Sequence, residues 1–229
     1  MDFDNDVKQQ YRGDEGKKYH DAVNYVPPKA YPWVARLRRD KMIPFITQQD
    51  VILEYGVGTG WNIAQIHCKK RMGYDLAEHL ESQLKKQGIE FIKDISAIPD
   101  ESINVVICHH VLEHIGNPCD TLKQINRILG KGGKLLLFVP HETGKKYQQY
   151  DPHEPNHHLY SWNVQTLGAL VEKMGFKVIN GSIKRFGYDR FSSVWAARLH
   201  LGESGFRLIR RVIHLIKPVS EICMVTTKK

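Results

Sequence analysis

An acid and three alternating glycines follow the first long run of apolar and β-branched residues in the chain. Residues 51–60 read VILEYGVGTG, with Glu54 followed by Gly56, Gly58 and Gly60. In an open parallel sheet the ligand binds at the carboxyl ends of the strands, and the first strand-to-helix turn approaches it most closely. Glycines on such a turn let the backbone bend tightly and let a ligand lie against the main chain. The segment therefore predicts a ligand-binding turn.

The spacing and charge of this turn favour a cationic ligand over a dinucleotide. Dinucleotide sites prefer G-x-G-x-x-G with the pyrophosphate at a helix N-terminus, whereas these glycines alternate as G-x-G-x-G. The carboxylate of Glu54 would repel a pyrophosphate, but it could attract the cationic amino-acid end of S-adenosylmethionine. A nicotinamide-dependent oxidoreductase, which shares the architecture, is disfavoured on the same ground.

Two further acids end the next two expected strands. Asp75 lies about 20 residues after Glu54, where a ribose needs an acceptor for its hydroxyls, although this feature alone serves NAD equally well. Asp94 ends the third strand and could bond an adenine amine while Ile95 lies against the ring. Three acids at three successive strand ends are hard to reconcile with an anionic ligand.

The elements that would position these residues alternate between short apolar strands and helical patterns from residue 50 onward. This alternation predicts a single α/β domain with a largely parallel sheet. Strands are expected at residues 50–56, 71–75, 89–94, 103–110, 134–140, 176–187 and 220–229, and helices at 61–69, 76–88, 117–133 and 163–175.

Two segments lie outside this alternation. Residues 1–46 are aromatic and proline-rich and then helical, and we expect them to form an N-terminal cap or lid ahead of a domain at 47–229. Residues 205–218 are basic, with apolar residues at helical spacing. We expect this segment to pack on its own domain, with peripheral membrane contact or a dimer interface as alternatives.

Composition limits the class of protein further. The 229 residues are 41% hydrophobic and contain no apolar run long enough to span a bilayer, so we expect a cytoplasmic protein. The four cysteines show no CxxC spacing and are expected to be reduced thiols. The net charge of +8 is spread along the chain rather than gathered in a stripe with interleaved aromatics, which favours a solvated basic surface over a dedicated nucleic-acid site.

In order, the blocks VILEYGVGTG, GYD, KDISAIPDESINVVICHHVLEHIGNP and RILGKGGKLLLFVP resemble the conserved motifs of class I S-adenosylmethionine-dependent methyltransferases, especially the small-molecule group. The resemblance covers residues 48–182. It implies a Rossmann-like seven-stranded sheet in the order 3-2-1-4-5-7-6, with the last strand antiparallel and helices on both faces. It also implies S-adenosylmethionine as the cofactor and S-adenosylhomocysteine as the product.

The resemblance further assigns residues to the parts of the cofactor. The methionine part would meet the acid and glycines of the first turn, the ribose would meet the end of the second strand, and the adenine would meet the end of the third. The cofactor-binding residues implied in this way are Tyr19, Glu54, Gly56, Gly58, Gly60, Asp75, Leu76, Asp94, Ile95 and His109.

Histidines on the acceptor side offer a general base. Methyl transfer is an in-line displacement at an activated sulfonium, so alignment and desolvation supply much of the catalysis, and a base is needed only where the acceptor proton is hard to lose. Histidine suits that task because its pKa lies near neutral pH. The candidates are His110 after the fourth strand and His153, His157 and His158 after the fifth. The alternative is that these side chains pack, cap turns or face solvent; His114 is expected to be structural.

A metal is an alternative use of the same loop. Five residues that can bind metals lie within eight positions: Asp151, His153, Glu154, His157 and His158. No spacing among them is diagnostic, so we assign no metal ligand and expect the loop to face the substrate.

These observations favour a cytoplasmic methyltransferase, monomeric or homodimeric, that acts on a small-molecule acceptor at a hydroxyl of a sugar or natural product. The sugar class rests on a resemblance of the HHLYSW block and the basic C-terminal segment to enzymes of glycan clusters. An RNA methyltransferase would explain the basic charge, but CHHV stands where an NPPY-type block would be expected. The other alternative is a non-catalytic protein that binds S-adenosylmethionine or serves as a scaffold.

Overall fold

Seven strands form one mixed sheet in the order β3-β2-β1-β4-β5-β7-β6. The computed structural model describes residues 9, 11–14, 16–18, 26–152, 156 and 158–229. The strands are β1 (Val51–Tyr55), β2 (Lys70–Tyr74), β3 (Glu90–Ile92), β4 (Ile103–His109), β5 (Leu129–Pro140), β6 (Phe176–Arg185) and β7 (Ser220–Lys228). β1 to β5 pair in parallel, whereas β7 runs antiparallel to both β5 and β6. The predicted strand order and the antiparallel last strand are therefore confirmed.

Helices cover both faces of this sheet because neighbouring residues of a strand point to opposite sides. In β1, Leu53 packs into one core with α5 and α6, while Ile52 packs into a second core with α4. The helices are α3 (Tyr31–Asp40), α4 (Glu81–Lys86), α5 (Pro118–Ile128), α6 (Val164–Lys173), α7 (Asp189–Arg198) and α8 (Gly202–Ile216), with short 3-10 turns η1 (Pro28–Ala30), η2 (Ile43–Phe45), η3 (Glu78–Leu80), η4 (Ile95–Ala97), η5 (Leu112–His114) and η6 (Lys145–Gln148).

Local sequence signals explain where the two longest sheet-covering helices begin. Asn117 accepts a hydrogen bond from the backbone N–H of Asp120 at the start of α5, and Pro118 occupies the first helical position. Asn163 and Thr166 form a reciprocal capping box at the start of α6. Both helices pack against the face of the sheet opposite α4.

Three predicted elements differ from the structure. Residues 61–69, expected as a helix, form consecutive turns that direct Ile63 and Ile66 into the core without a continuous helix. The helix expected at 117–133 ends at Ile128, because its glycines continue directly into β5. α7 was not predicted; its helix pattern is weak, since Ser192 and Ser193 occupy buried positions on it.

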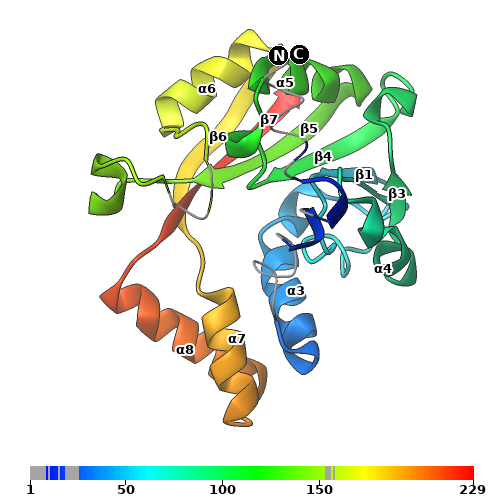
Figure 1. Cartoon of the computed structure of the whole chain (residues 1–229). Coiled ribbons are helices and arrows are strands. Elements are labelled where there is room, and N and C mark those ends of the chain that lie inside the picture. The colour runs from blue at the N-terminus through cyan, green and yellow to red at the C-terminus, as the bar shows by residue number, and fades with distance from the viewer. Residues whose placement is uncertain (1–8, 10, 15, 19–25, 153–155, 157) are drawn as a thin grey trace.

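A helical lobe, made of α3, α7 and α8, projects from one end of the sheet (Figure 1). Its small core contains Val34 from α3, Ala196 from α7 and Phe206 from α8, all buried. The lobe therefore combines a helix that precedes the first strand, α3, with the two helices that lie between β6 and β7. The division of the chain at residue 46 stays a prediction.

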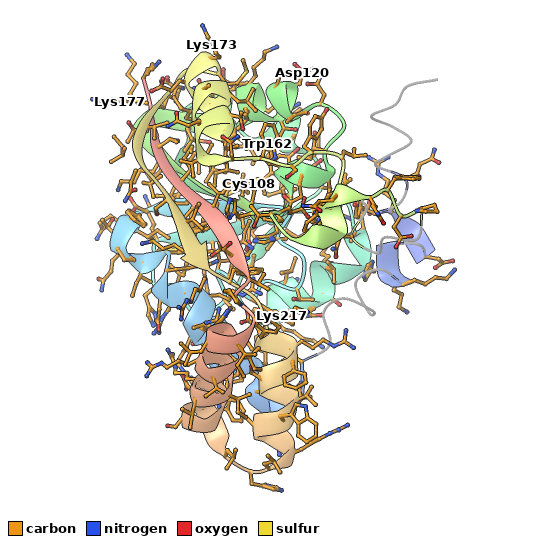
Figure 2. All side chains as sticks on the ribbon, turned by 90° about the vertical axis from the view of Figure 1, so that its left-hand side faces the viewer. Cys108, Asp120, Trp162, Lys173, Lys177 and Lys217 are labelled. Atoms are coloured by element: carbon orange, nitrogen blue, oxygen red, sulfur yellow. The ribbon has the colours of Figure 1, made fainter. Side chains whose placement is uncertain are left out.

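One face of α8 is apolar and exposed. Leu208, Val212, Leu215 and Ile216 are each at least 45% exposed, and Figure 2 shows α7 and α8 standing clear of the sheet beyond Lys217. Phe206 and Ile209 of the same helix face the lobe core, so packing on its own domain accounts for one side of segment 205–218. Membrane contact or dimerisation through the other side stays a prediction. Among the described residues, no helix has the length and apolar character needed to cross a membrane.

A buried aspartate holds the lobe together. Asp189 accepts hydrogen bonds from Arg38 of α3 at 2.9 Å and from Arg210 of α8 at 2.8 Å, and its side chain is only 6% exposed. This carboxylate therefore fixes all three helices of the lobe at one point.

The variant Asp189→Asn should lower the free energy of unfolding by about 3 kcal/mol, because two largely buried guanidinium groups lose their counter-charge. Urea unfolding of the full chain measures this loss. The matched control is Asp40→Asn, whose ion pairs with Arg39 and Arg207 are exposed, and which should cost less than about 1 kcal/mol. Equal small losses in both variants would show that Asp189 does not hold the lobe.

Candidate functional site

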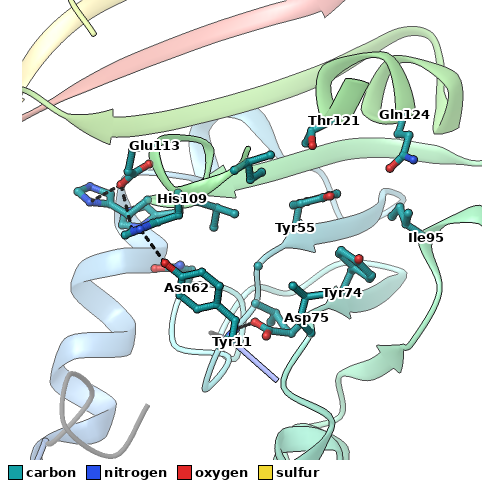
Figure 3. Close-up of a pocket in the computed structure, with 18 of the residues that line it drawn as sticks. Tyr11, Tyr55, Asn62, Tyr74, Asp75, Ile95, His109, Glu113, Thr121 and Gln124 are labelled. Carbon is teal, nitrogen blue, oxygen red and sulfur yellow. Dashed lines mark hydrogen bonds and ion pairs between the residues drawn. The ribbon is translucent and has the colours of Figure 1, made fainter. Parts of the chain in front are cut away.

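The carboxyl ends of β1, β2 and β4 open onto a cavity of about 880 Å³. Figure 3 shows Glu113 and His109 toward one end of this cavity and Ile95, Thr121 and Gln124 toward the other. Arg38 from the lobe and Phe186 after β6 also line it. The cavity therefore lies where the sheet, the lobe and the loops after the strands meet.

Most of the predicted site residues that the structure describes line this cavity. Those that do are Gly56, Gly58, Asp75, Leu76, Asp94, Ile95, His109, His110 and His158. Glu54 and Gly60 do not line it: Glu54 is fully buried behind the turn, and Gly60 packs against Leu84 and Ile89. Tyr19, His153 and His157 lie outside the described residues. The roles assigned to all these residues stay predictions.

The first turn needs glycine for reasons that the geometry makes specific. Gly56 has a φ of +73°, and a Cβ there would lie 2.3 Å from Cγ2 of Val111, so no other residue fits between β1 and the chain after β4. Gly58, with a φ of +50°, donates its N–H to Oδ2 of Asp75 at 2.8 Å. The glycine turn and the acid after β2 therefore support each other.

The acids after β2 and β3 are held by their own backbones. The other carboxylate oxygen of Asp75 accepts the N–H of Ala77 at 2.9 Å. Asp94 accepts the N–H and the hydroxyl of Ser96 at 2.8 and 2.6 Å, and these hydrogen bonds lower its pKa. A carboxylate has about four acceptor positions, so both acids keep positions for a further donor in the cavity.

Glu54 is a buried acid beside the cavity rather than in its wall. Asn62, which does line the cavity, donates its amide to Oε1 of Glu54, while Oε2 has no hydrogen-bond partner among the described residues. Burial raises the pKa of Glu54 to about 8, against the opposing effect of the Asn62 hydrogen bond. Asn62 thus connects the buried acid to the cavity.

A second buried group of charges surrounds His110. Glu221 of β7 lies 3.1 Å from Nε2 of His110, and Lys41 donates to both oxygens of Glu221 at 2.7 and 3.0 Å. Lys41 Nζ also lies 2.7 Å from Nε2 of His109 and 4.5 Å from the ring centre of Phe138. This cluster links the end of α3 to β4 and β7.

The charge states in this cluster follow from burial and from Glu221. Burial lowers the pKa of His109 and His110, and of Lys41, in each case more than the nearby Glu221 carboxylate raises it. Burial alone would raise the pKa of Glu221, but the neighbouring imidazoles of His109 and His110 and the charge of Lys41 reverse the effect and hold it well below its usual range. Glu221 is therefore the charged acceptor for neutral imidazoles.

Glu113 defines the same end of the cavity from the other side. Its side chain is 1% exposed, and burial raises its pKa to about 8. Its Oε1 lies 3.7 Å from Nδ1 of His110 and 4.0 Å from Nε2 of His114. His158 lies edge-on to His114, with the ring centres 4.8 Å apart.

Several residues of the cavity were not predicted. Glu113 and His114 sit in the motif LEHI, where the helical pattern suggested only packing, and Glu221 is far away in sequence on β7. Tyr11 lines the cavity from the N-terminal segment, where an aromatic had been expected at Tyr19. The sequence signal that could have added Glu113 to the predicted His110 and His158 is an acidic residue within the otherwise apolar run VLEHI.

Comparison with known proteins identifies the class. A family model described as a methyltransferase domain matches residues 24–180, so the chain belongs to that family, the class I S-adenosylmethionine-dependent methyltransferases, as the resemblance implied. The predicted cofactor, S-adenosylmethionine, is confirmed with it.

Individual relatives are distant. A probable S-adenosylmethionine-dependent methyltransferase of Mycobacterium tuberculosis is 26% identical over 59% of this chain, which spans about half (52%) of that protein. An uncharacterised protein of Methanocaldococcus jannaschii is 24% identical, with 67% of this chain and 78% of that protein covered. A phosphoethanolamine N-methyltransferase structure from Haemonchus contortus, in complex with S-adenosylhomocysteine, shares the fold with a TM-score of 0.59 at 17% identity, over 100% of this chain and 60% of the other.

The residues present fit this cofactor. Asp75 and Asp94 offer carboxylate oxygens to hydroxyl and amine donors, Leu76 and Ile95 offer apolar contact between them, and the glycine turn leaves room for a ligand against the backbone. When bound, S-adenosylmethionine supplies a methyl group activated by its sulfonium charge.

The pH dependence of stability tests the buried state of Glu54. Its raised pKa means that the folded chain keeps a proton that the unfolded chain releases above about pH 4.5, so the stability that Glu54 contributes is complete below that pH and is lost as the pH rises toward about 8. The Glu54→Gln variant lacks this titrating group. It therefore loses a pH dependence of the free energy of unfolding that amounts to at most about 1.4 kcal/mol per pH unit. The melting temperature of the variant relative to the native chain should therefore rise between about pH 5 and pH 8.

The exposed variant Glu172→Gln serves as the control, and its difference from the native chain should not change with pH. A difference for Glu54→Gln that stays constant or shrinks as the pH rises would mean that Glu54 is ionised in the folded chain.

Proposed function

We propose that this chain transfers the methyl group of S-adenosylmethionine to a hydroxyl of a small molecule, of the sugar or natural-product class. The proposal rests on the position of His110. Its half-buried imidazole lines the cofactor cavity and is oriented by Glu221. Such a base is useful where the acceptor proton is hard to remove, as it is for an alcohol.

The orientation of His110 assigns roles to its two nitrogens. The ionised Glu221 accepts the hydrogen of Nε2 at 3.1 Å, which leaves Nδ1 as the nitrogen able to accept a proton. A carboxylate that fixes the tautomer of a histidine base is also the logic of the serine hydrolase triad. The backbone of His110 has a φ of +54°, and such uncommon conformations gather at functional sites.

In the proposed reaction, the acceptor oxygen attacks the methyl carbon in line with the C–S bond. The new O–CH₃ bond forms as the C–S bond breaks, the electron pair of that bond stays on sulfur, and the hydroxyl proton goes to Nδ1 of His110. The chain's contribution is to align the acceptor, exclude water and accept this proton.

The lining of the cavity supports a small acceptor over RNA. Its volume lies within the range typical of small-ligand pockets. Among the described residues that line it, Arg38 is the single arginine or lysine, and it is already paired with Asp189. Tyr11, Trp61 and Phe186 add aromatic surface on which a ring can stack. Cytoplasmic location and a monomeric or homodimeric state remain part of the proposal.

Methyl transfer to a panel of sugars, phenols, thiols and short RNAs tests the proposal, with S-adenosylhomocysteine release as the readout. We expect release above the acceptor-free rate with at least one hydroxyl acceptor. Release with thiols or RNA alone, or with no acceptor in the panel, would contradict it.

The variant His110→Asn tests the base. Asparagine tolerates the left-handed backbone, so the fold should be retained, and turnover with the hydroxyl acceptor should fall by about 10²- to 10⁴-fold. The affinity for S-adenosylhomocysteine should change by less than about threefold, which is well below the change expected when a hydrogen bond to a charged group is lost. The exposed His67→Asn is the control. Turnover of His110→Asn equal to that of the control would remove His110 from the chemistry.

The variant Asp75→Asn tests the cofactor side of the cavity. Loss of a charged acceptor should weaken S-adenosylhomocysteine binding by about 10- to 100-fold in calorimetry. Asp100→Asn, which changes an exposed aspartate, is the control. Unchanged affinity in Asp75→Asn would show that this acid does not bind the ribose.

A further inference from the structure

Glu113 carries a buried carboxyl group that no described residue satisfies. Both of its oxygens are buried, and neither has a hydrogen-bond partner among the described residues, although the side chain lines the cavity. A buried carboxyl without partners is costly. Its oxygens are therefore available to a ligand at the wall of the cavity.

Two histidines offer ligand atoms beside this carboxylate. One ligand atom from each of Glu113, His114 and His158 lies within 4.8 Å of the other two, and Oε1 of Glu113 is 4.0 Å from Nε2 of His114. The two imidazole rings meet at 74°. Two histidines and one glutamate form a donor set that is common in zinc enzymes.

Both histidines also have the outer contacts typical of metal ligands. Nδ1 of His158 lies 2.6 Å from Oε1 of Glu142, and Nδ1 of His114 lies 3.0 Å from the hydroxyl of Tyr11. Histidines that bind metals usually donate their second ring nitrogen to a carboxylate or another acceptor, which fixes the tautomer and the direction of the ring. Here these contacts fall on Nδ1 of each ring, and Nε2 of His114 is the nitrogen nearest Glu113.

The backbone holds the three side chains together. The carbonyl of Glu113 accepts the N–H groups of Leu159 and Tyr160 at 2.8 and 3.2 Å, and the Tyr160 hydroxyl donates to the carbonyl of Gly116 at 2.9 Å. The loop that carries His158 is therefore anchored directly on η5, which carries the other two residues. Leu159 and Tyr160 of the HHLYSW block make these anchoring contacts.

We infer that Glu113, His114 and His158 bind a divalent first-row metal ion of the zinc class at the acceptor end of the cavity, with Glu142 and Tyr11 as outer partners. Ligand atoms around a tetrahedral ion lie about 3.4 Å apart, so binding shortens the distances between the three ligand atoms, now within 4.8 Å, by up to about 1.4 Å. Two imidazoles favour zinc or cobalt over magnesium, which prefers oxygen ligands. This site departs from the sequence prediction, in which no metal ligand was assigned.

The three residues can bind a metal ion whether or not the proposed function is correct. The catalytic role of that ion rests on the proposed function. Three protein ligands leave a fourth position, and all three side chains line the cavity. An acceptor hydroxyl at that position would lose its proton more readily, with His110 close by to receive it, since its Nδ1 is 3.7 Å from Glu113. The site therefore favours acceptors that present a hydroxyl over those that present only an amine.

Titration of the chelator-treated full chain with Zn²⁺ tests the site by calorimetry, and Co²⁺ gives a second readout through its visible absorption. We expect one ion per chain. Glu113→Gln should weaken binding by more than about 100-fold, and Glu142→Gln, which alters only an outer partner, by about 10- to 100-fold. The control variants Glu172→Gln and His67→Gln change exposed residues that do not contact the ion. Their affinity for Zn²⁺ should stay within about twofold of the native value.

Two results would overturn the inference: a native chain that binds no Zn²⁺, or a Glu113→Gln variant that binds it as tightly as the native chain. His158→Gln gives the same test if Glu113→Gln fails to fold. S-Adenosylhomocysteine binding, measured in the same samples, separates the two proposals. Cofactor binding without zinc binding would remove the metal site alone, whereas zinc binding without methyl transfer to any hydroxyl would remove the proposed function alone.

Discussion

The buried carboxylate of Glu221 is the contact on which the arrangement of the cavity depends. It receives Lys41 from the end of α3 and lies beside both histidines at the end of β4, so three segments far apart in sequence meet at one charge. Burying one negative group among several donors is stable only when its hydrogen bonds are satisfied. The antiparallel pairing of β7 with β5 places Glu221 opposite Pro140, at the edge where the parallel strands end.

The cavity concentrates ionisable groups that a simple core would exclude. Glu113 in the wall of the cavity and Glu54 directly behind it are buried acids with raised pKa values, while the buried His109 and the half-buried His110 have lowered ones. Such groups reduce stability, and their gathering in one cavity is typical of a functional site. The same pattern explains why the two proposals share one end of the cavity: a base oriented by Glu221 and a metal site at Glu113 would act on the same hydroxyl.

Much of the sheet could be predicted because its signals are local. Apolar strands, turn residues and the acids at strand ends are all read from neighbouring positions, and the resemblance to a known family supplied the strand order. Asp75 and Asp94 reach the cavity because the carboxyl ends of parallel strands share one edge of the sheet. The expected helix at 61–69 was wrong: these residues form consecutive turns, in which the Ala64 carbonyl accepts a hydrogen bond from the side chain of Arg71.

What could not be predicted depends on contacts between distant segments. The pairing of Glu221 with His110 requires β7 to return antiparallel, and the contact of His158 with Glu142 requires the loop to be anchored on Glu113. Neither relation leaves a periodic signal in the sequence. Glu54 shows the converse case: its position in the motif was recognisable, but its complete burial behind Asn62 was not.

The measurement that most directly tests the account is calorimetric titration of the native chain with S-adenosylhomocysteine and, separately, with NAD⁺. We expect binding of S-adenosylhomocysteine at one molecule per chain, with no signal from NAD⁺, because the carboxylates of Asp75 and Asp94, rather than phosphate-binding groups, follow β2 and β3 in the cavity wall. Binding of NAD⁺, or of neither ligand, would contradict the assignment of the cavity to S-adenosylmethionine.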